Sequence, residues 1–124
     1  MNATQLPFLV EGILILTTMA IGFLIRRVGK PYGKVKIALH LFLYLWFAVG
    51  FAFIVSAPPI HNVSNLTWGF VAVMTLAILT QLGTGTWMLI WKASRKVLPK
   101  IHVASAALLL ISDVVVFFLT GMSA

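Results

Sequence analysis

The sequence has no cysteine and very little charge. The absence of cysteine excludes disulfide bonds, thiolate chemistry and cysteine-ligated metals. Only 9% of the 124 residues are charged, whereas 61% are hydrophobic. A soluble domain of this size needs a polar surface over most of its exterior, and this composition does not supply one. We therefore expect residues 1–124 to form a single integral membrane domain in a lipid bilayer.

Long apolar runs are what the sequence does have. They lie at about residues 6–25, 37–57, 68–91 and 101–120, and each is close to the ~20 residues that cross a bilayer core as a helix. The connections are short, so successive helices should pack antiparallel. The sequence therefore predicts an all-α fold, a four-transmembrane-helix antiparallel bundle that crosses the cell membrane as a multi-pass protein.

The positive charge is confined to two short segments. All nine Lys and Arg fall within Arg26–Lys36 and Lys92–Lys100, each of which lies between apolar runs. With two acidic residues elsewhere, the net charge is +7. This distribution is typical of cytoplasmic loops beside anionic lipid headgroups, and it does not indicate nucleic acid as a partner. The positive-inside rule predicts that both basic loops are cytoplasmic and that both termini lie outside.

Few polar side chains interrupt the apolar runs. Ionisable groups inside a bilayer are energetically expensive, so each one is a candidate functional residue. On a helix, His102 and Asp113 share one face, because eleven residues make about three turns. The candidates are Glu11, His40, His102 and Asp113, with Gln81 as a neutral amide. We expect the helix faces that carry them to point into the bundle.

Glu11, Gln81 and Asp113 are expected at similar depth. Counted from the helix ends that adjoin the Lys and Arg segments, their depths in the membrane lie within about 6 Å of one another. A carboxyl group at that depth should be neutral or paired. Three roles fit these residues: a structural hydrogen-bonded cluster, a relay that carries protons to a quinone, or a cation site.

The two histidines enter the membrane from the same side. His40 lies four residues beyond Lys36 and His102 two beyond Lys100, so their depths differ by about 3 Å. Two imidazoles at equal depth on facing helices can supply both axial ligands of one low-spin haem b, which leaves no open position for dioxygen. The alternative for either histidine alone is an interfacial side chain that bonds to lipid or backbone.

Small and basic residues near the same depth complete the predicted haem site. Gly22, Gly83 and Gly85 lack side chains and would leave space for the macrocycle. Cations in and beside the two basic segments could pair with the haem propionates. The candidates for this pairing are Arg26, Arg27, Lys36 and Lys100.

The segments that end at these histidines resemble four-helix membrane b-type cytochromes. Cytochrome b561-like and ferric-reductase-like cores and the anchor subunits of respiratory oxidoreductases are examples. The residues that carry the resemblance are Lys36–His40 (KIALH) and Pro99–His102 (PKIH), each of which opens a helix at the basic side. Larger families in this group have a second histidine pair near the opposite face. Here His61 stands alone in that part of the sequence, so the resemblance implies one haem.

The resemblance also implies a role and partners. The chain would be a non-catalytic subunit that exchanges electrons with a quinone or a partner redox protein. Other membrane or redox subunits, or further copies of the chain, would be its neighbours.

Two other interpretations stay open. Four helices with Glu11 in the first resemble the small multidrug resistance transporters, which would give Glu11 and Asp113 a role in proton-coupled transport. The aromatic and glycine segment typical of that family is not found within residues 68–91, and that family provides no role for His40 or His102. The other interpretation is a cofactor-free structural subunit of a larger membrane complex.

Overall fold

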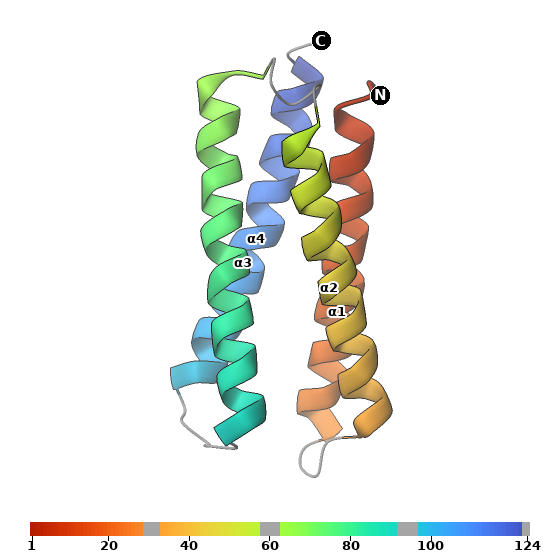
Figure 1. The fold of residues 1–124 in the computed structure, drawn as a ribbon, viewed down its shortest axis with the longest axis vertical. Helices are drawn as coiled ribbons and strands as arrows, with labels where there is room; N and C mark the ends of the chain where they lie inside the picture. Colours follow the sequence, from red (N-terminus) through yellow and green to blue (C-terminus); the bar gives the residue numbers. More distant parts are fainter. Residues whose placement is uncertain (29–32, 58–62, 92–96, 123–124) are drawn as a thin grey trace.

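All four predicted spans are helices. The computed structural model describes residues 1–28, 33–57, 63–91 and 97–122. Helix α1 comprises Gln5–Val28, α2 Lys34–Ser56, α3 Asn65–Trp91 and α4 Val97–Met122 (Figure 1). Each helix is long and apolar enough to cross a membrane. The chain is therefore a multi-pass integral membrane protein built as an all-α bundle, and this part of the sequence prediction is confirmed.

The helices extend beyond the apolar runs at their basic ends. Helix α1 continues through Arg26 and Arg27, and α2 begins at Lys34. Lys and Arg are good helix formers, and their long side chains can reach the headgroup region while the backbone stays helical. Helix α4 likewise starts at Val97, before Pro99, which is tolerated in a first turn because its missing N–H needs no partner there. The apolar runs thus predicted the number and order of the helices and underestimated their length.

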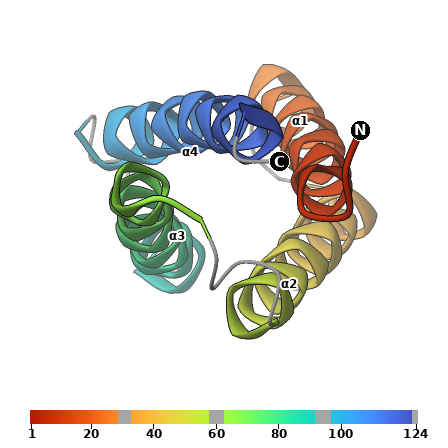
Figure 2. The same cartoon turned by 90° about the horizontal axis from the view of Figure 1, so that it is seen from above.

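The helices form a ring with one loosely packed seam. Helix α1 packs against α2 and α4, and α4 packs against α3, whereas α2 and α3 do not pack closely (Figure 2). Both termini lie at one end, here named the terminal end (Figure 1). The opposite end, here named the basic end, is where α1 and α3 finish. The α1–α2 and α3–α4 hairpins separate from each other toward the basic end (Figure 1).

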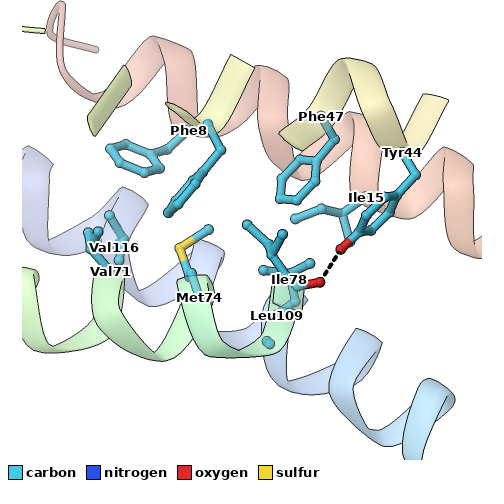
Figure 3. Close-up of a cluster of buried hydrophobic side chains, with 11 residues drawn as sticks. Phe8, Ile15, Tyr44, Phe47, Val71, Met74, Ile78, Leu109 and Val116 are labelled. Carbon is cyan, nitrogen blue, oxygen red and sulfur yellow. Dashed lines mark hydrogen bonds between the residues drawn. The ribbon is translucent and has the colours of Figure 1, made fainter. Parts of the chain in front are cut away.

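The interior is apolar and is supplied by all four helices. Phe8, Phe47, Met74, Leu109 and Val116 are each at most 1% exposed (Figure 3). The faces that carry the polar candidates point inward, as the sequence predicts. The buried residues on these faces are Glu11, Ile15 and Thr18 in α1, Tyr44, Phe47 and Phe51 in α2, Gln81 in α3, and Ala106, Leu109 and Asp113 in α4.

Large apolar side chains cover the outside of the bundle. Phe42, Trp46 and Phe53 are among many that are more than half exposed. In water such a surface would promote aggregation, but in a bilayer it contacts the acyl chains.

A hydrogen bond crosses the loosely packed seam between α2 and α3. The Tyr44 hydroxyl donates to the carbonyl oxygen of Ile78 at 2.9 Å (Figure 3). The Tyr44 ring also packs against Phe47, with ring centres 5.9 Å apart. This contact lies in the middle of the bundle, between the two groups of polar residues described next.

Candidate functional site

The two membrane histidines lie side by side. His40 belongs to α2 and His102 to α4, and their ring centres are 6.5 Å apart with 54° between the ring planes. Both side chains are partly buried. The structure therefore brings together the two residues that the sequence predicts as a ligand pair, one from each hairpin.

The imidazole of His40 is fixed by α1. Its Nδ1 lies 2.9 Å from the carbonyl oxygen of Thr18. A carbonyl oxygen can only accept a hydrogen bond, so Nδ1 carries the hydrogen and donates it. In the neutral ring, Nε2 then holds the lone pair.

The imidazole of His102 is fixed by α3, and it also carries its hydrogen on Nδ1. Its Nδ1 lies 2.9 Å from Oγ1 of Thr84, and that hydroxyl donates its own hydrogen to the carbonyl oxygen of Thr80 at 2.8 Å. Since the hydroxyl has only one hydrogen, its oxygen accepts the hydrogen bond from Nδ1 of His102. The Gln81 side chain also donates to the backbone carbonyl of His102 at 3.1 Å. Helix α3 thus holds both the ring and the backbone of this residue.

The two Nε2 atoms remain available as ligands. Within the described part of the chain neither makes a hydrogen bond. Metal-bound histidines usually donate their other ring N–H to a carbonyl or another polar group, as both rings do here. With each Nε2 about 2 Å from a shared metal ion and about 1 Å from its own ring centre, the two ring centres are roughly 6 Å apart. The observed 6.5 Å between the ring centres is close to this value.

Glycines leave the space that the imidazoles occupy. A β-carbon at Gly22 would lie 2.9 Å from Cε1 of His40, and one at Gly85 would lie 3.2 Å from Cε1 of His102. These glycines were predicted to admit a macrocycle, and in the structure the rings of the two histidines fill their places. Each histidine can therefore lie in a close helix–helix seam.

The other predicted haem-site residues lie at the surface. A β-carbon at Gly83 would meet no atom within 4 Å, and this glycine is exposed. Arg26 and Arg27 are exposed in the last turn of α1, at the basic end. These three residues lie on the same half of the bundle as the imidazoles.

A second polar site lies nearer the terminal end. Asp113 is eleven residues beyond His102, or about 16 Å along α4. Glu11 is 3% exposed and Asp113 is 2% exposed. Within the described residues, Oε2 of Glu11 and Oδ1 of Asp113 are buried without a hydrogen-bond partner.

Glycines also make room for both carboxyl groups. Oε1 of Glu11 occupies the place of a β-carbon at Gly50 in α2. Oδ2 of Asp113 lies 2.7 Å from the place of a β-carbon at Gly12 in α1. Gly12 and Gly50 were not predicted as site residues, although glycines inside membrane helices commonly mark such close approaches.

Gln81 lies with the histidines. The sequence placed it with Glu11 and Asp113 by counting residues from the helix ends, and its depth differed by three to four residues. In the structure its amide instead donates to the backbone carbonyl of His102, which lies eleven residues, or about 16 Å, from Asp113 along α4. Thr84 belongs to the same inward face as Gln81, and its role as hydrogen-bond acceptor depends on the ring position that only the fold shows.

Comparison with known protein families, curated proteins and solved structures finds no match to this chain. The fold itself defines the class, a multi-pass integral membrane bundle of four helices. Its function is argued from the histidine pair and the carboxyl pair.

Proposed function

We propose that the chain is a membrane electron-transfer subunit that binds one low-spin haem b through His40 and His102. The observation that carries this proposal is the pair of imidazoles with ring centres 6.5 Å apart, both held through Nδ1. A metal ion shared by the two Nε2 atoms would account for this arrangement.

The number of protein ligands favours haem over a bare metal ion. The described residues contain no group of three or more His, Cys, Asp or Glu side chains that could hold a metal ion. A structural zinc site normally needs four such ligands. Haem iron already has four ring nitrogens and needs only two axial ligands, which is what this pair of histidines offers.

The surroundings of the pair are compatible with a macrocycle that reaches the basic end. Both imidazoles are only partly buried. Arg26 and Arg27 at the end of α1 supply cations that would pair with propionates. By the positive-inside rule, this end faces the cytoplasm and both termini lie outside.

Two histidine ligands suit electron transfer. A haem with both axial positions filled supplies one-electron chemistry and leaves no site for dioxygen. The protein orients each ring through its Nδ1 hydrogen bond, with the Thr18 carbonyl on one side and the Thr84 hydroxyl on the other. The redox partner would be a quinone or another redox subunit.

Absorption spectroscopy of the purified protein tests the proposal. Protein expressed with ample haem is purified in detergent, and a reduced-minus-oxidised spectrum is recorded together with a pyridine haemochrome assay. We expect a sharp α-band and about one haem b per chain. His40→Ala and His102→Ala should each abolish haem retention, whereas His61→Ala, which changes the third histidine, should not. Haem-free wild-type protein would refute the proposal and favour the structural-subunit or transporter interpretation.

A further inference from the structure

The buried carboxyl pair lacks partners for two of its oxygens. Glu11 and Asp113 are almost completely buried, and Oε2 of Glu11 and Oδ1 of Asp113 have no hydrogen-bond partner in the described part of the chain. An ionised carboxylate without a partner is strongly unfavourable in an apolar interior. These two oxygens therefore require a positive species that the polypeptide does not supply nearby.

No basic side chain lies within reach of the pair along the helices. Arg26 is fifteen residues from Glu11 on α1, or about 22 Å, and Lys100 is thirteen residues from Asp113 on α4, or about 20 Å. Helix α3 carries no ionisable side chain. On α2, His40 and Tyr44 are nearer the basic end, and both are hydrogen-bonded to backbone carbonyls.

The environment of the pair favours a proton over a metal cation. Hard metal cations take about six or more oxygen ligands. Here one oxygen of each carboxyl group is held against a glycine, at Gly50 and Gly12, which leaves two free oxygens. The inward side chains one turn away on the same two helices are apolar and buried; they are Phe8, Ile15, Leu109 and Val116. A proton needs only one of the free oxygens and removes a negative charge.

Polar side chains lie at the terminal end of the helices that carry the pair, one turn beyond the buried Phe8 and Val116. Gln5 on α1 donates to the carbonyl oxygen of Phe117 at 3.2 Å, one helical turn beyond Asp113 on α4. Asn2 donates to the carbonyl oxygen of Thr120 at 3.0 Å, closer to that end. One turn from the pair the inward side chains are apolar in both directions, but Glu11 is six residues, or about 9 Å, from the start of α1 and seventeen residues, or about 26 Å, from its end.

We propose that Glu11 and Asp113 form a proton-binding site that exchanges with water at the terminal end. The site carries at least one proton at neutral pH, bound at the two unpartnered oxygens. It lies apart from the histidine pair, and it does not depend on whether haem is bound.

Infrared spectroscopy of the carboxyl groups tests the first part of this proposal. Glu11 and Asp113 are the only acidic side chains in the sequence, so a buried carboxyl signal belongs to this pair. We expect the carbonyl stretch of a protonated carboxyl group at neutral pH, which shifts in D₂O and disappears at high pH. The double variant Glu11→Gln with Asp113→Asn should lack it at every pH. Only carboxylate bands at neutral pH in folded wild-type protein, or bands that respond to Na⁺ at constant pH, would overturn the proposal.

The rate of deuterium exchange tests the second part, exchange at the terminal end. Gln5→Leu removes a polar group between the pair and the terminal end, so it should slow the D₂O shift of the carboxyl band severalfold. Thr17→Val is the matched control, since Thr17 is an exposed α1 residue that bonds only to the backbone of Ile13. Unchanged exchange in Gln5→Leu, or equal slowing in both variants, would refute exchange at the terminal end.

Discussion

The histidine pair and the carboxyl pair are packed alike and leave different atoms free. At both sites a polar side chain from one helix occupies space that a glycine leaves on a neighbouring helix. The histidines each use one ring nitrogen for a hydrogen bond, and the other is a neutral electron-pair donor. Among the residues that the structure describes, each carboxyl group keeps one oxygen without a hydrogen-bond partner, and that oxygen would bear charge if the group were ionised. The first site is therefore suited to a metal ion and the second to a proton.

The seam between α1 and α2 shows this packing in both directions. Gly22 of α1 makes room for His40 of α2, and Gly50 of α2 makes room for Glu11 of α1. Lipid tails are as apolar as leucine, so membrane helices associate through close packing and hydrogen bonds rather than through hydrophobic burial. Each helix of this seam therefore contributes both a polar side chain and the space for its partner's polar side chain.

The largest expected effect is loss of haem, which should follow changes at the histidine pair but not changes at the carboxyl pair. Under the proposed function, His40→Ala or His102→Ala removes one of the two proposed haem ligands and should abolish haem retention. Glu11→Gln and Asp113→Asn keep the shape of the carboxyl groups about 16 Å away along α4, so haem content and the absorption spectrum should stay unchanged. The pyridine haemochrome assay measures the haem content, and reduced-minus-oxidised spectra measure the absorption of the bound haem. Loss of haem in Asp113→Asn would show that the two sites form one unit.

The glycine contacts predict the next largest effect. Gly50→Ala places a methyl group where Oε1 of Glu11 lies, and Gly22→Ala places one 2.9 Å from His40. Each should lower the free energy of unfolding by about 1–3 kcal/mol, because the packed helices cannot move apart without losing contacts. Tryptophan fluorescence during unfolding in mixed micelles measures this change.

A matched glycine provides the control for those variants. A β-carbon at Gly69 would meet no atom within 4 Å, so Gly69→Ala should cause no loss of stability. Equal destabilisation by Gly69→Ala and Gly50→Ala would show that backbone flexibility rather than side-chain space explains the glycines.

The Thr84 hydroxyl should affect haem affinity and potential without affecting the fold. Thr84→Val removes the acceptor for Nδ1 of His102, which makes the imidazole a less basic ligand. We expect haem affinity to fall by about 10–100-fold and the midpoint potential to rise. Haem titration and redox potentiometry measure the two effects.

Thr80→Val is the control for this prediction. Thr80 is exposed, and its hydroxyl bonds to the carbonyl oxygen of Leu76 within the same helix. Equal midpoint potentials in Thr84→Val and wild type would contradict this prediction and show that the Thr84 hydroxyl does not tune the imidazole of His102.

The smallest effect is expected at the seam between α2 and α3. Tyr44→Phe deletes the hydroxyl that donates to the carbonyl oxygen of Ile78 and retains the ring. Stability should fall by about 0.5–1.5 kcal/mol. Ser56→Ala, which removes an exposed hydroxyl bonded within α2, should have no measurable effect in the same unfolding assay. A similar loss in both variants would mean that the interhelical bond adds nothing to stability.

The sequence predicted the helices and the inward faces because hydrophobicity and helical periodicity act locally. It also predicted which two histidines belong together, because the basic segments mark the depth at which each helix enters the membrane. It did not predict the hydrogen bond from His102 to Thr84, nor the glycines that face Glu11 and Asp113. Those contacts depend on the rotation and offset of one helix against another, which no single helix encodes. Depths counted from the helix ends are accurate only to about a turn or more, so this count could not separate Gln81 from the carboxyl pair.

The split of the histidines between two hairpins has a consequence for biogenesis. Residues 1–57 hold one imidazole and residues 63–122 hold the other, and the hairpins meet closely along α1 and α4. Neither half synthesised alone could chelate a metal ion through both rings. Co-expressed halves that find each other in the membrane would regain the chelate, so the colour of the cofactor would report correct assembly. Under the proposed function, cofactor binding would then require that both hairpins have assembled into the complete bundle.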